Sequence, residues 1–166
     1  NGDNVINDDD RYIYRNPNAN VLMGFQSSMK YKKFDFAFNL RASFNNYVYN
    51  NVNAANAQYN LLLDNEVLGN IPTNVLDTGF VVNSQENTLS DIYIENASFL
   101  RMDNMQIGYT IDKNNDGAGV MRLSFNVQNP FIITEYSGTD PEVFGGIDNT
   151  IYPRQRVFLF GVNYQF

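Results

Sequence analysis

Residues Phe34–Phe44 read FDFAFNLRASF, in which apolar side chains on one set of positions alternate with mostly polar ones on the other. A period of two is the pattern of a β-strand with one apolar and one polar face. The run is 11 residues long, whereas strands of soluble proteins average about five or six. A tilted strand needs about ten residues to cross the hydrocarbon layer of a membrane. The stretch therefore indicates a strand long enough to span a bilayer.

The same alternation recurs on both sides of this strand. Val21–Tyr31 precedes it across a turn of two residues, Lys32 and Lys33, and three further runs follow it. The pattern predicts five strands, at residues 20–31, 34–47, 92–111, 120–131 and 153–166. Their short connections alternate with two long segments, 48–91 and 132–152. Because outer-membrane barrels have short periplasmic turns and long extracellular loops, we expect these two segments to be extracellular.

Alternation by itself does not separate a membrane barrel from a secreted β-sandwich, since both have strands with one apolar face. Strand length favours the barrel, and so does the position of the aromatic residues. Phe and Tyr favour the two interfaces of a bilayer, and they cluster at both ends of the predicted strands. At the short-turn end these are Tyr31, Phe34, Tyr109, Tyr164 and Phe166, and at the long-loop end Phe44, Tyr47, Phe131 and Phe158. The alternative is a β-sandwich that binds carbohydrate.

Five strands cannot close into a transmembrane barrel, because the smallest known have about eight. An open sheet edge in lipid also leaves backbone groups unpaired. We therefore expect the chain to be one piece of a larger barrel.

Composition excludes several functions. The chain has no Cys and no His, which rules out thiol nucleophiles, disulfides and histidine general bases. Its 18 Asp plus Glu exceed its 11 Lys plus Arg, giving a net charge of -7, and no basic stripe suggests nucleic-acid binding. Any catalysis would have to rest on carboxylates, Lys, Tyr or hydroxyl groups. For a piece of a membrane barrel we expect none: we predict that the chain is not an enzyme, that it has no catalytic residue and that it requires no cofactor.

Three segments closely resemble the C-terminal end of SusC/RagA-type TonB-dependent outer-membrane transporters: NASFLRMDNMQIGYTI (96–111), RLSFNVQNPFIITEYSGTDPEVFG (122–145) and YPRQRVFLFGVNYQF (152–166). The opening NGDNVINDDDRYIYRNPNANVLMGF (1–25) is similar to the loop and strand that precede them in this family. The resemblance implies the last five antiparallel strands of a 22-stranded barrel, with the plug domain and the TonB box lying upstream and outside this chain.

The resemblance also implies a function. Such transporters import oligosaccharides or peptides across the outer membrane of Gram-negative bacteria, with a SusD-like surface lipoprotein as a lid and TonB supplying the energy. The expected partners are therefore that lipoprotein, TonB, the rest of the barrel and plug, and outer-membrane lipid. A passive porin, without plug or lid, is a further alternative. The sequence leaves open the solute, the oligomeric state and the role of the loop at residues 50–90.

The polar faces of the predicted strands would line the lumen of such a barrel, because lumen-facing and lipid-facing residues alternate. They would contact the plug or the solute, or simply form a solvated wall. The predicted lumen-lining residues are Gln26, Ser28, Lys30, Asn39, Arg41, Asn104, Gln106, Ser124, Asn126 and Gln128.

A calcium loop is one interpretation of the N-terminal segment. Asn1, Asp3, the carbonyl group of Val5 and Asp10 have the spacing of oxygen ligands around a hard cation. The first Asp of the motif would precede Asn1, and Asn4 stands where the loop usually has Gly. An acidic surface loop without a bound ion is the alternative.

Two further motifs carry the resemblance. The first comprises Tyr136, Gly138, Asp140, Pro141 and Glu142 in the second long loop. It either contacts the lid lipoprotein or has a structural role, in which Pro fixes a turn and carboxylates cap nearby amides. The second is a terminal aromatic series that resembles the signal read by the barrel-assembly machinery and that would also anchor the strand in lipid: Phe158, Phe160, Tyr164 and Phe166.

Overall fold

The computed structural model describes residues 8–64, 67–82, 84–112 and 119–165. The chain divides into two compact units. We call the first the sheet unit; it comprises Asn20–Phe44, Ser98–Glu135 and Pro153–Phe166. The second, the loop unit, comprises Asn1–Ala19, Asn45–Ala97 and Tyr136–Tyr152.

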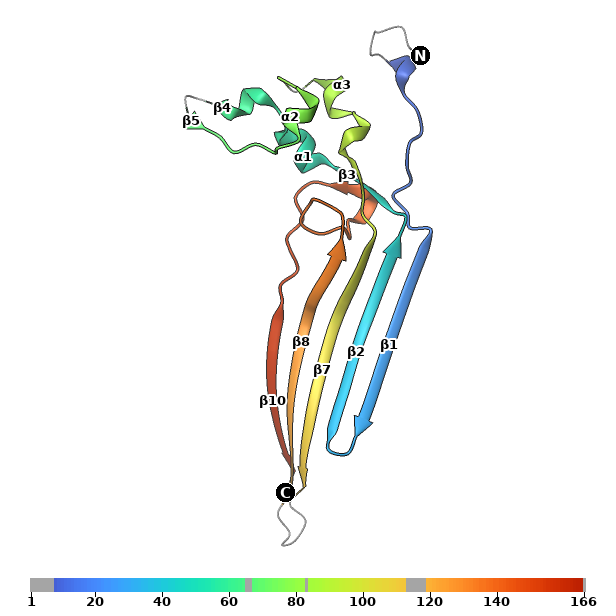
Figure 1. The fold of residues 1–166 in the computed structure, drawn as a ribbon, viewed down its shortest axis with the longest axis vertical. Coiled ribbons are helices and arrows are strands. Elements are labelled where there is room, and N and C mark those ends of the chain that lie inside the picture. Colours follow the sequence, from blue (N-terminus) through green and yellow to red (C-terminus); the bar gives the residue numbers. More distant parts are fainter. Residues whose placement is uncertain (1–7, 65–66, 83, 113–118, 166) are drawn as a thin grey trace. The chain divides into compact units, whose positions relative to one another are not determined.

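The sheet unit is one five-stranded sheet (Figure 1). Its order is β1-β2-β7-β8-β10, and every neighbouring pair is antiparallel. Within the described residues, β1 and β10 each pair on one side only. The strands are β1 (Val21–Tyr31), β2 (Phe34–Phe44), β7 (Phe99–Asp112), β8 (Val120–Thr134) and β10 (Val157–Gln165).

The turn between β1 and β2 sets the register of the first hairpin. Residue pairs run without interruption from Val21 opposite Phe44 to Tyr31 opposite Phe34. Lys32 has a φ of 53°, in the left-handed region that tight hairpin turns require and that favours glycine. The turn is tied to the next strand, because the backbone N–H of Thr110 donates to the carbonyl oxygen of Lys33 at 2.8 Å.

A β-bulge interrupts the middle of the sheet at Asp103. Asn39 lies opposite Asn104 and Leu40 lies opposite Met102, so Asp103 is the extra residue of β7. The register between β7 and β8 shifts at the same place, where Asn129 of β8 has a φ of 50°. Since successive strand residues point to opposite faces, the extra residue restores Met102 and Leu100 to the face of Met105.

Two strands do not extend as far toward the long loops as the sequence pattern predicts. The strand predicted over residues 34–47 ends at Phe44, because Asn45 adopts a φ of 60° that breaks extended backbone. The strand predicted over residues 92–111 begins only at Phe99. At this point Asn46 and Ala97 exchange hydrogen bonds, from the Ala97 N–H to the Asn46 carbonyl at 2.9 Å and from Asn46 Nδ2 to the Ala97 carbonyl at 3.0 Å.

The loop unit consists of short elements. Three strands form a small sheet of order β6-β3-β9, in which β3 is antiparallel to β6 and parallel to β9. The strands are β3 (Tyr47–Asn50), β4 (Leu63–Asp64), β5 (Val67–Leu68), β6 (Ile94–Asn96) and β9 (Ile147–Asp148). The helices are η1 (Asp8–Asp10), α1 (Asn51–Asn56), η2 (Tyr59–Leu62), α2 (Val75–Thr78), α3 (Gln85–Thr88), η3 (Asp91–Tyr93) and η4 (Phe144–Gly146), where η marks a 3-10 helix.

Both clusters of buried apolar residues lie in this loop unit. One contains Val48, Ala97 and Tyr136 with Val143 packed against it. The other contains Ala54, Ala57 and Tyr93, with Tyr49 and Phe80 at its edge. The long loops therefore have a packed core of their own among the described residues. Across the same described ranges, no helix has the length and apolar character needed to cross a membrane.

Candidate lipid-facing and lumen-facing surfaces

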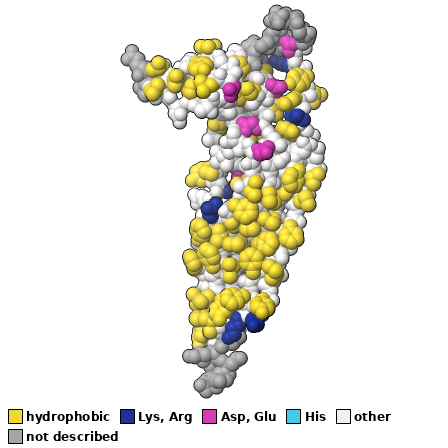
Figure 2. All heavy atoms as spheres, in the orientation of Figure 1, with side chains coloured by type: hydrophobic (Ala, Val, Ile, Leu, Met, Phe, Trp, Pro, Cys, Tyr) yellow, Lys and Arg dark blue, Asp and Glu magenta, His cyan; other side chains and the backbone are white. Residues whose placement is uncertain are grey.

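The register of the sheet unit collects the large apolar side chains on one face, which we call the apolar face. Rows of paired residues cross the strands, such as Met29, Phe36, Ile107, Phe125 and Phe160. Figure 2 shows the hydrophobic side chains as a broad area over these strands. The remaining large members are Val21, Met23, Phe25, Tyr31, Phe34, Phe38, Leu40, Phe44, Leu100, Met102, Met105, Tyr109, Ile111, Met121, Leu123, Val127, Phe131, Ile133, Phe158, Val162 and Tyr164.

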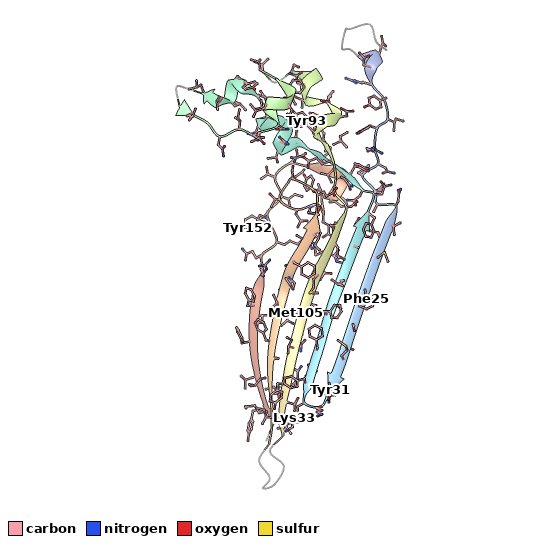
Figure 3. All side chains as sticks on the ribbon, viewed as in Figure 1. Phe25, Tyr31, Lys33, Tyr93, Met105 and Tyr152 are labelled. Carbon is pink, nitrogen blue, oxygen red and sulfur yellow. The ribbon has the colours of Figure 1, made fainter. Side chains whose placement is uncertain are left out.

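Many of these side chains are more than one-third exposed, whereas Val127 is buried at 4% exposure and others, such as Phe36 and Met105, are half-buried. Phe160 is 83% exposed, Val162 70% and Phe25 59%. Phe25 and Met105 are labelled on β1 and β7 in Figure 3. Apolar patches of more than a few hundred Å² are rare on soluble monomers and mark contact with a partner or a membrane. The sheet unit thus presents an extended apolar surface.

Aromatic rings reinforce this face across the strands. Phe125 lies between two rings of β10, with centroid distances of 6.2 Å to Phe158 and 4.7 Å to Phe160. On the same face, between β2 and β7, the ring centroids of Phe34 and Tyr109 are 4.6 Å apart. Such cross-strand pairs add to the backbone hydrogen bonds that hold neighbouring strands together.

Three of the five aromatic residues predicted at the short-turn end share one row, whereas Tyr164 lies opposite Met121 outside it and Phe166 falls outside the described residues. Tyr31, Phe34 and Tyr109 occupy paired positions. At the other end, Phe44 and Phe131 lie near the ends of β2 and β8. The placement of Tyr47 in this belt is wrong, because Tyr47 begins β3 of the loop unit.

All ten residues predicted to line a lumen lie on the opposite, polar face. Gln26, Asn39, Asn104 and Gln128 form one row of amides across β1, β2, β7 and β8. The other members share the parity of this row: Ser28, Lys30, Arg41, Gln106, Ser124 and Asn126. That this face borders a lumen remains a prediction.

One ion pair on the polar face spans three strands. Arg122 of β8 reaches over β7 to Asp35 of β2, with its Nε 3.2 Å from Oδ1 and its Nη2 2.5 Å from Oδ2. Gly108 lies beneath the pair, and a Cβ there would be 2.3 Å from Asp35 Oδ1 and 2.5 Å from Arg122 Nη2. A side chain at position 108 would therefore force the two ends of the ion pair to shift. Alternation placed Asp35 and Arg122 on the polar face, but no sequence signal joined residues so far apart in the chain.

A second ion pair uses the bulge. Arg41 of β2 donates from Nε to Asp103 Oδ2 at 2.6 Å and from Nη2 to Oδ1 at 2.9 Å. A bidentate guanidinium–carboxylate pair of this kind is geometrically specific. Without the bulge, strict alternation would place Asp103 on the face of Met105. The extra residue thus keeps a carboxylate off the apolar face.

The motif of the second long loop lies in the loop unit, where it makes structural contacts. Tyr136 is buried and its hydroxyl donates to Asp148 Oδ2 at 2.7 Å. A Cβ on Gly138 would be 2.4 Å from the Tyr136 ring. The Glu142 N–H donates to Asp140 Oδ1 at 2.9 Å, as expected for a capping carboxylate before Pro141. A role in binding a lipoprotein remains a prediction.

Ser137 joins this motif to the rest of the loop unit. Its N–H donates to Glu95 Oε2 at 2.8 Å, and its Oγ lies 2.8 Å from Glu95 Oε1. Asn50 Nδ2 donates to the same Oε1 at 2.9 Å, while Asn50 Oδ1 caps α1 by accepting from the Asn53 N–H. The sequence pattern did not predict the roles of Glu95, Asn50 and Asp148, because each lies in a loop segment without periodicity.

Burial and the hydrogen bond to Asp148 raise the pKa of the Tyr136 hydroxyl above its ordinary value, with burial as the larger cause. The neutral hydroxyl is the form that donates to the carboxylate. The motif is therefore stabilised as long as Tyr136 keeps its proton.

Two predicted sites extend beyond the described residues. Asn1, Asp3 and Val5 of the calcium loop lie outside them, and Asp10 belongs to η1. Among the described residues, no group of three or more acidic side chains is arranged to hold a metal ion. Phe158, Phe160 and Tyr164 of the aromatic series lie on the apolar face of β10, and Phe166 also falls outside the described range.

Known proteins are similar in sequence to this chain over nearly its whole length. No protein-family model matches the chain. It is nevertheless 45% identical over 100% of its length to the TonB-dependent receptor SusC of Bacteroides thetaiotaomicron, of which it covers 17%. The chain is related to the SusC/RagA-type TonB-dependent receptors. TonB-dependent receptor P3 of Formosa agariphila is 25% identical over 99% of the chain, which covers 18% of that protein.

The fold agrees with this relationship. The RagAB peptide importer in its 'closed-closed' state matches 93% of the chain with a TM-score of 0.71 at 19% identity, and the chain covers 18% of that structure. The SusC/RagA resemblance and the all-β antiparallel class predicted from the sequence are thus confirmed. These relatives are named as receptors and importers, in agreement with the prediction that the chain is not an enzyme. The chain spans less than a fifth of their length.

Met105→Arg tests which face contacts lipid. Met105 lies in the middle of β7 on the apolar face, where arginine near a bilayer midplane costs about 2–4 kcal/mol. The free energy of unfolding of the complete protein in phospholipid vesicles should fall by that amount. Gln106→Arg, one residue along on the polar face, is the matched control and should cost less than about 1 kcal/mol. Equal losses for the two variants would contradict the assignment of the faces.

Gly108→Ala tests the ion pair that crosses β7. The new Cβ should separate Asp35 from Arg122 and lower the free energy of unfolding by about 1 kcal/mol, a small value because both side chains are about one-third exposed. The control is Gly24→Ala, since no atom lies within 4 Å of a Cβ there. In an Asp35→Asn background the Gly108 effect should largely vanish, and an undiminished effect would contradict the explanation.

Tyr136→Phe tests the role of the loop motif. Loss of the hydroxyl leaves the buried Asp148 carboxylate without one donor and should destabilise the loop unit by about 1.5–3 kcal/mol. The readout is faster proteolysis of the outer loops in the complete protein, with the exposed Tyr152→Phe as control. If the two variants are cleaved at equal rates, the hydrogen bond does not hold the loop unit together.

The raised pKa of Tyr136 also predicts a pH dependence. A folded-state pKa above the unfolded value of about 10 stabilises the loops fully below pH 10, and this stability declines as pH rises further, by at most about 1.36 kcal/mol per pH unit. Protease resistance of the wild-type loops should therefore fall above about pH 10. The Tyr136→Phe variant should lack this component of the decline.

Proposed function

We propose that this chain forms part of the barrel wall of a TonB-dependent importer in the outer membrane of a Gram-negative bacterium. The observation that carries the proposal is the 45% identity to SusC along the whole chain. The described sheet supports it physically, because its apolar face needs a cover and its two edge strands need partners. Further strands of the same barrel would pair with β1 and β10, and lipid would cover the apolar face.

The secreted β-sandwich alternative conflicts with the exposure of the sheet. In a sandwich the inner faces of two sheets interdigitate to form the core. Here Phe160 and Val162 of β10 and Phe25 of β1 are more than half exposed. The fold match to the RagAB importer also disagrees with a sandwich.

The proposed solute is an oligosaccharide or a peptide, and the proposed partner is a SusD-like surface lipoprotein. The description of RagAB as a peptide importer supports a peptide as one of the two solute classes. The packed loop unit supplies a rigid surface suited to a protein partner, since its loops have two apolar clusters and a hydrogen-bonded motif. In this proposal TonB acts through a part of the protein outside this chain.

Energy dependence separates the importer from a passive porin. Cells producing the complete protein should take up labelled oligosaccharides or peptides at a rate at least about tenfold above cells that lack it. An uncoupler of the proton gradient should abolish this difference, because TonB-driven transport needs the gradient. The control is a small solute that enters through other porins and whose uptake should not change. Uptake that persists undiminished with the uncoupler would favour the porin.

A further inference from the structure

The turn between β1 and β2 carries a concentration of positive charge. Lys30, Lys32 and Lys33 supply three of the 11 cations of the chain within four residues. All three side chains are exposed. Within the described residues, Lys32 and Lys33 have no carboxylate partner, since the nearest acidic residue in sequence, Asp35, binds Arg122 on the polar face. Among the side chains that the structure describes, neither ammonium group of this turn is paired with a carboxylate.

These two lysines adjoin the end of the apolar face. Tyr31, 71% exposed, and Phe34, 55% exposed, flank them directly. Tyr109 continues the row, and its neighbour Thr110 ties the turn to β7 through the Lys33 carbonyl. Figure 3 labels Tyr31 and Lys33 at this end of the strands. Aromatic rings favour the headgroup level of a bilayer, so the ammonium groups one residue beyond them reach the level of the lipid phosphates.

The backbone of Lys32 gives a second, independent observation. Its φ of 53° is a conformation in which glycine avoids the steric cost that every side chain incurs. Its ammonium group also lies 5.3 Å from the centre of the Tyr31 ring, a cation–π distance that orients the side chain toward the aromatic row. Glycine would fit this turn position without strain, so the presence of lysine indicates that its positive charge has a role at the membrane interface.

From this geometry we propose that Lys32 and Lys33 bind the phosphate group of an anionic phospholipid, such as phosphatidylglycerol, in the leaflet around the short-turn end of the sheet. The proposal rests on the proposed placement of this sheet in the outer membrane. Charge complementarity selects the lipid, because two neighbouring ammonium groups favour a headgroup with a net negative charge over a zwitterionic one. The chain is acidic elsewhere, with no Lys or Arg between Arg41 and Arg101, so this attraction is confined to a few places.

The test uses the complete protein purified in a mild detergent. Native mass spectrometry would measure the binding of phosphatidylglycerol and of phosphatidylethanolamine with the same acyl chains. The wild type should bind phosphatidylglycerol more tightly. Each lysine near an anionic surface contributes roughly fivefold, so Lys32→Gln with Lys33→Gln should weaken phosphatidylglycerol binding about thirtyfold and leave phosphatidylethanolamine binding unchanged.

Two further variants separate charge from structure. Lys30→Gln is the matched control, because Lys30 lies at the same end of β1 but shares the polar face with Gln26, and it should bind both lipids like the wild type. Lys32→Gly should lose about fivefold in phosphatidylglycerol binding while retaining or increasing thermal stability, because glycine fits the left-handed turn.

Three results would overturn the proposal. The first is equal affinity of the wild type for the two lipids, and the second is unchanged phosphatidylglycerol binding in the double variant. The third is displacement of the lipid by millimolar inorganic phosphate, which would indicate a free-phosphate site. Cell fractionation tests the membrane placement separately: if that placement is wrong, the complete protein will not be found in the outer-membrane fraction. If the protein is in that fraction but binds the two lipids equally, only the lipid site is wrong.

Discussion

The ladder of backbone hydrogen bonds between neighbouring strands is the constraint on which the rest of the sheet depends. In hydrocarbon a backbone N–H or carbonyl group finds no water, so each strand must pair with a neighbour on both sides. Pairing also fixes the face of every side chain, because a shift of one residue would turn the whole apolar set to the other face. The unbroken register from Val21–Phe44 to Tyr31–Phe34 meets this requirement between β1 and β2. The outer sides of β1 and β10 leave it unmet within the described residues.

The bulge at Asp103 shows how that constraint tolerates a local exception. A carboxylate among the large side chains of the apolar face would be unfavourable, and strict alternation along β7 would place Asp103 there. An extra residue shifts the parity of the strand, so that Asp103 reaches Arg41 on the polar face. Gly108 has no side chain, and this gives Arg122 room to cross β7 and reach Asp35. On the polar face, Arg41 is thus paired with a carboxylate of the adjacent strand, and Arg122 with one two strands away.

The loop unit follows different physics. Its strands have two to four residues, too short to be held by ladder hydrogen bonds alone. Its stability comes from buried aromatic rings and from carboxylates that collect donors, such as Glu95 with Ser137 and Asn50 and Asp148 with Tyr136. A surface loop built in this way keeps a defined shape, which a binding partner can recognise without first ordering it.

The sequence by itself determined the strands, their two faces and the family resemblance, because a period of two is a local property that each residue reports independently. All ten polar positions from Gln26 to Gln128 fell on one face for this reason. Only the tertiary structure decided where that period is interrupted, which residues pair across strands and how the loops pack. The ion pairs Arg41–Asp103 and Arg122–Asp35 join residues that are distant in sequence. The hydrogen bond between Tyr136 and Asp148 lies in a loop whose sequence has no periodicity. Such contacts depend on register and on loop closure in three dimensions, which no local pattern encodes.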